Sequence, residues 1–474
     1  ILFSYHKTSE NFLQRIMALC VSSHYKNSPN DLQMMSDAPA HHLFCLLPPV
    51  TLKHLKKSKI PDILCFIQVC LEGEICKDSI MASLSRGQRA SGDLIPWTIS
   101  QQFQDSHFAS LSGVRIVRIA TNPNYQKMGY GTRALQLLED YYRGLYNVDL
   151  IESINNVDDE ANAEDRIKTL DAPLLLDLKE RKAEKLDYFG VSFGLTQELL
   201  KFWKKSGFIP VYLRQTTNEL TGEHSCIMLK QLNNNSITTN NWLHEFWIDF
   251  RKRFISLLSY EFSKFSTTFA LNILQNVSSS TNDQTTTTTT TLNKDELFIH
   301  ISVYDLKRLE LYSQNLVDYH LIVDLLPTVT KLYFLNRFDP SFHLSHVQNA
   351  ILLGIGLQHK NVDIISEEFK LPATQILGLF SRSIKKMTNY FRSLCEKEIE
   401  ESLRTKNLGQ ASSLNPLGQS LDDELIEVEK LINDDERKRK KQLAKDLSQF
   451  AIKGIIIGNI SIFLFCLVWF FNRK

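Results

Sequence analysis

The sequence lacks the patterns that identify metal proteins and disulfide-rich secreted proteins. Its eight cysteines, at positions 20, 45, 65, 70, 76, 226, 395 and 466, include no Cys-x-x-Cys pair, which argues against a zinc site and a disulfide framework. No metal site is therefore predicted, and a reducing compartment is the simpler interpretation. The 54 Lys and Arg residues nearly balance the 53 Asp and Glu residues, so any affinity for nucleic acid must come from local patches.

The chain also lacks a signal segment and a P-loop. It opens with isoleucine and has no basic stretch followed by an apolar run, so we expect residue 1 to be an internal point of a longer protein. No Gly-x-x-x-x-Gly-Lys-Ser/Thr motif occurs, which excludes a P-loop within these residues. The hydrophobic content of 43% is nevertheless sufficient for the cores of two or three domains.

The first half of the chain alternates strand-like and helix-like segments. Short β-branched or aromatic runs predict strands over 63–71, 114–120 and 188–193. Apolar residues at helical spacing predict helices over 12–18, 132–142 and 196–205, the last with Thr196 as its N-cap. A polar stretch over about 145–185 is typical of an insertion. Residues 1–235 are therefore predicted to form one α/β domain.

From position 241 onward strand signals nearly vanish. Long segments rich in Leu, Ile and Phe predict helices over 242–265, 297–335 and 344–390. Residues 236–400 are therefore predicted to form an all-α domain, interrupted at about 276–295 by a Ser/Thr/Asn-rich run that is too polar to order. Within it, 344–356, 362–368 and 374–385 have the spacing of a helix-turn-helix unit, which either binds nucleic acid or only packs. Lys385, Lys386 and Arg392 are expected on its exposed face.

The C-terminal part combines a charged helix with an apolar run. Residues 401–453 are predicted to form a charged tail helix, whose basic block at 437–441 suits nuclear import, RNA contact or a solvated helix face. Residues 454–471 form an apolar run close to the ~20 residues that span a bilayer, and they include Gly454 and Gly458 at Gly-x-x-x-Gly spacing. This run is either a membrane tail anchor or a divergent or misread end.

Gly129 and Gly131 stand one residue apart, between a predicted strand and a predicted helix. Such a turn exposes backbone amides and lets a phosphate approach, while the helix N-terminus adds positive potential. A dinucleotide-binding fold would need a third glycine where Ala134 stands. The pattern Gln126-x-x-Gly129-x-Gly131 instead fits the Gln/Arg-x-x-Gly-x-Gly/Ala signature of the GNAT acetyltransferases.

A closer resemblance extends over about residues 4–450. The segments that resemble the RNA cytidine acetyltransferase family are 24–50, 84–97, 125–142, 193–229 and 304–322, and Phe202 to Phe208 resembles the aromatic and Gly-Phe segment before the last hairpin of the fold. The resemblance implies an α/β GNAT acetyltransferase fold followed by an all-α RNA-binding domain. It also implies acetyl transfer from acetyl-CoA to the exocyclic 4-amino group of cytidine in rRNA and tRNA.

The resemblance further implies where the cofactors would lie. The acetyl-CoA contacts that it implies are Ile119, Ala120, Thr121, Gln126, Lys127, Met128, Gly129, Tyr130, Gly131, Thr132 and Lys205. The strand backbone would pair with the pantetheine arm, and the turn would hold the pyrophosphate. ATP with Mg²⁺ is also implied, but family members bind it in a helicase-like module that precedes the residues present here.

The candidate catalytic residues follow from the chemistry of the acceptor. The 4-amino group of cytidine is a poor nucleophile that must lose a proton, and a neutral histidine or a carboxylate can accept it. His41, His42 and Glu72 are the candidates, and the sequence does not separate the two histidines. Weaker candidate acceptors are Glu74, Asp93, Glu223 and His224. The candidate basic contacts for RNA or CoA phosphates are Arg86, Lys127 and Arg133.

Partners and location also follow from the resemblance. rRNA and tRNA are the expected partners, with a tRNA-binding adaptor protein and a guide small nucleolar RNA as further candidates, and a homodimer stays open. The resemblance implies a nucleolar location and a role in small-subunit ribosome biogenesis, whereas a genuine apolar C-terminus would imply a tail-anchored membrane protein. Two other functions remain open: an RNA-holding ribosome-assembly scaffold, and a protein N-acetyltransferase.

Overall fold

The computed structural model describes residues 7–24, 27–49, 61–87, 92–146, 175–232, 242–275, 291–409 and 421–449. The chain divides into two units, residues 1–398 and residues 399–474. Most of the predicted insertion, most of the Ser/Thr/Asn-rich run and the whole apolar segment 454–471 lie outside the described residues. None of the helices within the described ranges is long and apolar enough to cross a membrane.

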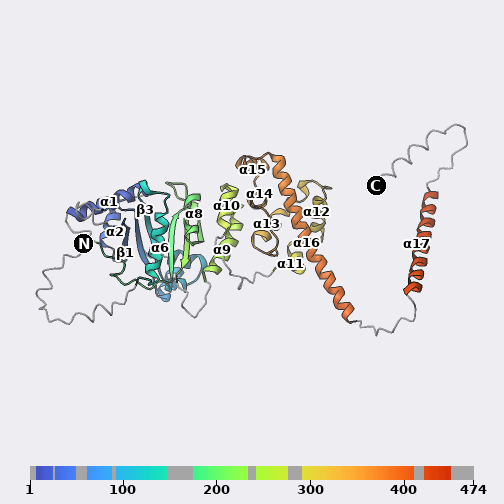
Figure 1. Cartoon of the computed structure of the whole chain (residues 1–474), viewed down its shortest axis with the longest axis horizontal. Coiled ribbons are helices and arrows are strands. Elements are labelled where there is room, and N and C mark those ends of the chain that lie inside the picture. The colour runs from blue at the N-terminus through green and yellow to red at the C-terminus, as the bar shows by residue number, and fades with distance from the viewer. Residues whose placement is uncertain are drawn as a thin grey trace. The chain divides into compact units, whose positions relative to one another are not determined.

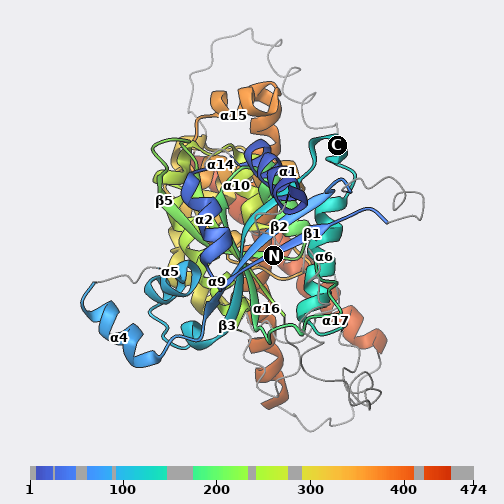
Figure 2. The same cartoon turned by 90° about the vertical axis from the view of Figure 1, so that its left-hand side faces the viewer.

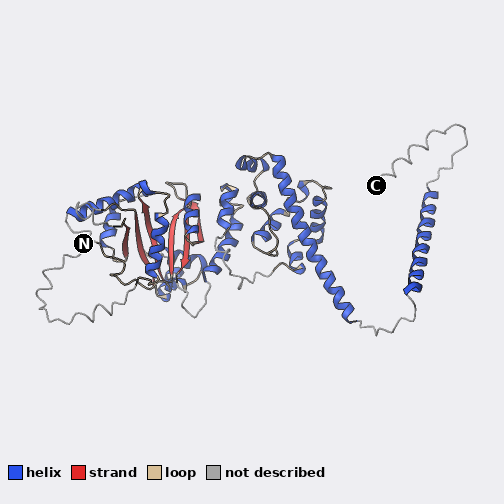
Figure 3. Ribbon diagram, in the orientation of Figure 1, coloured by secondary structure: helices blue, strands red, loops and turns tan. Residues whose placement is uncertain are grey.

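The first unit contains one mixed sheet of six strands in the order β1-β2-β3-β4-β6-β5 (Figure 3). The strands are β1 (His41–Leu46), β2 (Cys65–Gly73), β3 (Ser112–Thr121), β4 (Tyr188–Gly194), β5 (Ile209–Thr217) and β6 (His224–Gln231). β3 and β4 are parallel, and the other neighbouring strands are antiparallel. The predicted strands are therefore confirmed, β5 and β6 form the last hairpin that the resemblance implied, and β1 is an addition that the patterns did not identify.

Helices cover both faces of this sheet (Figure 2). α1 (Lys7–Ser23) and α2 (Pro29–Asp37) pack on one face, where Phe12 and Ile16 lie with Phe66 of β2. α6 (Tyr130–Tyr142) and α8 (Gln197–Lys205) share the other core, in which Leu135 and Leu138 are buried. Each such apolar side chain contributes about 1.5–3 kcal/mol when it leaves water. α4 (Lys77–Ser85) and α5 (Leu94–Phe103) lie between β2 and β3 in the chain.

Beyond residue 241, the regular structure in the described ranges is helical, as predicted (Figure 1). Its helices in the first unit are α9 (Trp242–Leu257), α10 (Thr267–Leu274), α11 (Lys294–His300), α12 (Val303–Ser313), α13 (Leu326–Phe334), α14 (His346–Gly356), α15 (Val362–Phe369) and α16 (Ala373–Gly409). The three helices predicted for the helix-turn-helix unit are α14, α15 and α16. α16 continues past the expected domain boundary at 400 into the second unit, which also contains the charged helix α17 (Leu421–Gln449).

A buried lysine joins the sheet domain to the helical region. Lys204 of α8 is 8% exposed, and its ammonium group donates to the carbonyl oxygens of Asn272, Ile273 and Gln275 at the end of α10. These are carbonyls that a helix leaves without internal partners. Burial lowers the pKa of Lys204 to about 8. Lys204 therefore acts as a C-terminal cap supplied from another part of the chain.

Replacing Lys204 by methionine should test this cap. The variant keeps the aliphatic stem but removes the donors, and a buried carbonyl left without a partner costs about 1–3 kcal/mol. We expect the free energy of unfolding in urea to fall by about 2–3 kcal/mol. The neighbouring exposed Lys205→Met variant should change it by less than about 0.5 kcal/mol. Equal stability of the two variants would contradict the capping role.

Candidate functional site

The hydrogen-bonded pairing of β3 with β4 ends about halfway along the two strands. Their parallel pairing runs from Gly113 with Tyr188 to Ile116 with Val191, although β3 continues to Thr121 and β4 to Gly194. The register of β3 against β2 also shifts here, because Gln68 pairs with Arg118 while Val69 pairs with Ile116. The extra residue is Val117, and a β-bulge of this kind bends its strand. Among the described residues, no strand pairs with the β4-facing edge of β3 beyond Ile116.

The glycine turn follows directly from this open edge. Lys127 and Gly129 have φ angles of 63° and 89°, the left-handed region, and α6 begins at Tyr130. The first helical bond runs from the amide of Arg133 to the carbonyl of Gly129, so the preceding amides have no partner inside the helix. A Cβ at Gly131 would lie 3.2 Å from Oγ1 of Thr121, at the end of β3. Glycine is therefore favoured at 129 by its conformation, while at 131 the small residue lets the start of α6 lie close to Thr121.

The positions implied for acetyl-CoA lie around this edge and turn. Ile119, Ala120 and Thr121 form the end of β3, and Ala120 is fully buried in the core. Gln126, Lys127, Met128 and Gly129 form the exposed turn, and Tyr130, Gly131 and Thr132 open α6. Lys205 is exposed on α8, whose Phe202 ring lies 3.7 Å from the place of a Gly131 Cβ. The structure thus brings β3, the turn and α8 together.

His41 and His42 face different surroundings. Nδ1 of His41 lies 3.0 Å from Nε2 of Gln68, a side chain that is 1% exposed. Burial, then the Arg115 guanidinium, lowers the pKa of His41, while Glu72 opposes this shift. Gln68 pairs with Arg118, which is next to the Val117 bulge. His41 therefore faces the charged groups near the point where β3 and β4 separate.

His42 is held by groups from other elements. Its Nδ1 lies 3.5 Å from the hydroxyl of Tyr142, at the end of α6, and its Nε2 lies 3.1 Å from Nη2 of Arg181. Burial, then the charge of Arg181, lowers the pKa of His42. Both ring nitrogens of His42 thus have protein neighbours, whereas only Nδ1 of His41 has one within the described residues.

Glu72 is buried and fully engaged. Its carboxylate is 1% exposed, accepts a bond from Nε of Arg115, and accepts another from the amide of Ile95 at 3.1 Å. Breaking a buried pair is costly because one charge is left without its partner, so this geometry favours a role in holding Arg115. Sequence patterns did not select Arg115 or Arg118, although two charges within an otherwise apolar strand were a usable signal.

The weaker candidates are dispersed. Asp93 accepts a hydrogen bond from the amide of Gly73 at 3.1 Å, and Glu74 is exposed. The His224 ring packs against Phe262 and Phe265, and its Nδ1 lies 2.9 Å from the carbonyl oxygen of Arg214. Glu223 reaches the backbone of Gly194 at the end of β4. Arg86 is exposed, and Arg133 bonds Gln136 on the surface of α6. No cluster of residues suited to a metal ion occurs within the described ranges.

The basic side chains predicted on α16 are exposed, but two have intramolecular partners. Lys386 donates to the carbonyl of His343 and lies over the ring of Phe342, and Arg392 pairs with Glu396 at 2.9 Å. Lys385 has no ion-pair partner within the described residues. Lys204 was also missed, although its position four residues after the buried Leu200 places it on the same helix face.

Comparison with known proteins covers almost the whole chain. Residues 15–233 match the family described as GNAT acetyltransferase 2, and residues 242–455 match the family described as Possible tRNA binding domain. RNA cytidine acetyltransferase from Homo sapiens is 53% identical over 469 residues, which is 96% of this chain and 44% of that protein. The Saccharomyces cerevisiae protein of the same name is 54% identical over 420 residues, or 85% of this chain and 39% of that one.

The matches also include a more distant relative. RNA cytidine acetyltransferase 2 from Arabidopsis thaliana is 40% identical over 479 residues, covering 97% of this chain and 45% of that protein. Among solved structures, the ribosomal-protein-S18-alanine N-acetyltransferase from Escherichia coli has a TM-score of 0.26 and 10% identity, over 50% of this chain and 95% of that one.

The chain spans less than half the length of these curated relatives. Sequence identity across nearly all of its residues, together with the two matched families, agrees with the split sheet and the helical region described above. The chain therefore belongs to the family of RNA cytidine acetyltransferases and carries a GNAT acetyltransferase domain followed by a helical domain of the tRNA-binding type.

Proposed function

We propose that this chain transfers the acetyl group of acetyl-CoA to the exocyclic 4-amino group of cytidine in RNA. The observation that carries the proposal is the parting of β3 from β4 beside the Gly129–Gly131 turn. The open strand edge offers backbone bonds to an extended amide-containing arm, and the free amides at the start of α6 suit a diphosphate. When bound, acetyl-CoA supplies an activated acetyl group. The names of the relatives support cytidine in RNA as the acceptor.

We assign the cofactor side of the site to β3, the turn and α8. Ile119, Ala120 and Thr121 would contribute backbone groups, residues 126–132 would hold the diphosphate, and Lys205 would offer its exposed charge. Because Ala120 is fully buried, its methyl group would only pack in the core. The sheet domain 1–235 would thus bind acetyl-CoA, while the helical region 236–400 would hold RNA.

For the acceptor side we propose His41 as the proton acceptor. Burial, then the charge of Arg115 and a smaller contribution from Arg118, lowers the pKa of His41 against the effect of Glu72. This lowered pKa favours the neutral imidazole. The oxygen of Gln68 is buried without a hydrogen-bond partner as placed. With this amide turned so that the oxygen accepts from Nδ1–H of His41, Nε2 of His41 would be free to take the proton of the 4-amino group. β1 and β3 are two strand spacings apart, about 10 Å, with β2 between them. Glu72 would hold Arg115, and His42 would anchor β1 to α6.

The wider cellular role rests on the sequence resemblance. We propose rRNA and tRNA as substrates, a nucleolar location and a contribution to small-subunit ribosome biogenesis, with an adaptor protein and a guide RNA as candidate partners. Coupling to ATP and Mg²⁺ would require residues outside this chain. The exposed basic block at 437–441 in α17 supports contact with RNA or an import receptor.

The decisive test is mass spectrometry of nucleosides from RNA incubated with the protein and acetyl-CoA, with and without ATP and Mg²⁺. Acetylated cytidine is the expected product. An acetylated peptide in a competition with RNA would favour protein N-acetylation instead. RNA binding without any acetylated nucleoside, from a protein that binds acetyl-CoA, would favour the scaffold function.

Replacing Gly131 by glutamate should abolish acetyl-CoA binding while the fold is kept. The new carboxylate fills the space between the turn and Thr121 and repels a diphosphate. Calorimetric titration with acetyl-CoA measures the loss, and circular dichroism checks the fold. Gly131→Ala is the matched control, since its Cβ needs only a small shift of the Thr121 hydroxyl. Undiminished binding by the glutamate variant would rule out this turn as the cofactor site.

Replacing His41 by glutamine should lower kcat by about 10²–10⁴-fold, the usual contribution of a general base. The affinity for acetyl-CoA should not change. Because the pKa of His41 is lowered, the base form persists below pH 6.5, so wild-type kcat should fall only under that pH. His42→Gln serves as the comparison. If the His42→Gln variant lost the fall of kcat at low pH while the His41→Gln variant kept this fall, His42 would be the proton acceptor and the assignment to His41 would be wrong.

A further inference from the structure

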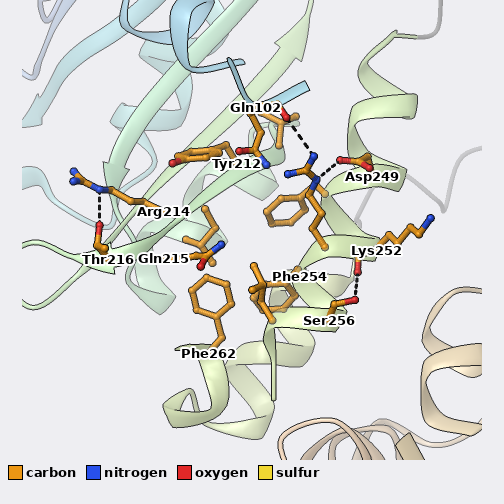
Figure 4. A pocket seen from close by; sticks show the side chains of 15 residues that line it. Gln102, Tyr212, Arg214, Gln215, Thr216, Asp249, Lys252, Phe254, Ser256 and Phe262 are labelled. Carbon is orange, nitrogen blue, oxygen red and sulfur yellow. Dashed lines mark hydrogen bonds and ion pairs between the residues drawn. The ribbon is translucent and has the colours of Figure 1, made fainter. Parts of the chain in front are cut away.

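A cavity lies at the β5 edge of the sheet, away from the proposed cofactor site. It has a volume of about 610 Å³ and is formed by β5, by α9, by Phe262 after α9 and by Gln102 of α5 (Figure 4). Ligand sites commonly measure about 300–1,000 Å³. Two strand spacings, β4 to β6 to β5, or about 10 Å, separate it from the edge where β3 and β4 part. It is therefore distinct from the cofactor site.

The floor of this cavity is apolar and its rim is basic. Val211, Leu213, Phe254 and Phe262 are buried in its wall, and the half-buried ring of Tyr212 lies at its side (Figure 4). Arg214, Lys252 and Arg253 supply three positive charges, and Asp249 supplies one negative charge. Asp249 pairs with Arg253 at 2.7 Å. Arg214 and Lys252 form no ion pair within the described residues, so the rim has an excess of positive charge.

β5 is irregular where it borders the cavity. Leu213 pairs with Cys226 and Thr217 pairs with His224, so three residues of β5 lie opposite Ser225 alone. The side chains of these three residues, Arg214, Gln215 and Thr216, are exposed. A bulge breaks the regular row of amides and carbonyls that an added strand would need. This edge therefore presents side chains to a ligand and is poorly suited to pairing with a peptide strand.

We propose that this cavity binds one unpaired nucleotide of an RNA strand, outside the cytidine that is modified. The base would lie against the apolar floor beside Tyr212, and the phosphates on its two sides would lie near Arg214 and near Lys252, which extend to opposite sides of the cavity (Figure 4). A nucleotide combines a planar apolar base with an anionic phosphate. The apolar floor suits the base, and the basic rim suits the phosphate. The amide of Gln215 can both donate to and accept from a base edge.

The position of the cavity gives this contact a use. β5 belongs to the sheet domain and α9 is the first helix of the helical region, so a nucleotide held between them touches both. Such a contact would fix the path of an RNA strand relative to the sheet. The inference rests on the proposal that RNA is the substrate, but its test measures binding and does not need acetylation.

The test uses the full 474-residue chain and a fluorescent single-stranded oligoribonucleotide. A length of about 16 nucleotides matches the upper end of the site sizes known for folds that bind single strands. Arg214→Glu combined with Lys252→Glu should weaken binding by at least about 10-fold and reduce the slope of log K against log salt by about 2. Lys7→Glu combined with Lys77→Glu changes the net charge equally at exposed positions of α1 and α4, outside the helical region proposed to hold RNA. This control should lose less than about 3-fold.

A second variant tests the cavity without changing charge. Ser256 is exposed on α9 at the cavity wall, and Ser256→Trp would fill the space where the base is expected. We expect about a 10-fold loss of affinity, in the range of one base stacking contact. Ultraviolet crosslinking of the wild-type complex should label the peptide that contains Tyr212. Equal losses in both charge-reversal pairs, with normal binding by Ser256→Trp and no label on that peptide, would overturn the proposal.

Discussion

The site depends on one break in backbone pairing. If β3 and β4 stayed in register to their ends, the amides and carbonyls of β3 beyond Ile116 would be consumed by the sheet. The extra residue Val117 prevents this, because it shifts the register of β3 against β2 at the same point. A strand edge inside a sheet is normally unfavourable, since its polar groups need partners. The proposed ligand would supply those partners. The unpaired amides and carbonyls of β3 that destabilise the sheet without a ligand are therefore the same groups that would bind it.

The turn was predictable from the sequence because its causes are local. Gly129 has a left-handed backbone, and Gly131 lies close to Thr121. Both features favour glycine, so the turn is visible in the sequence as two glycines separated by one residue. The order of strand, turn and helix followed from apolar spacing over the same segment. The break in pairing was not predictable, because it depends on which residues of β2 and β4 meet β3, and register is a long-range property.

The candidate acids and bases show the same limit. His41 and His42 are adjacent in sequence, and only the pairing of β1 with β2 decides that one meets Gln68 while the other meets Tyr142. Glu72 was chosen as a free carboxylate, but Arg115 lies 43 positions further along the chain and meets it only in the fold. Lys204 and Lys205 look alike as residue types, yet one is buried and the other is exposed.

The short helix α8 contacts both halves of the first unit. Phe202 reaches the glycine turn, and Lys204 caps α10. Because the Lys204 amine is enclosed by protein, reagents that acylate lysines in water will modify Lys205 and spare its neighbour as long as the cap is closed. The ratio of labelling at these two adjacent positions therefore reports directly on whether the sheet domain and the helical region remain joined.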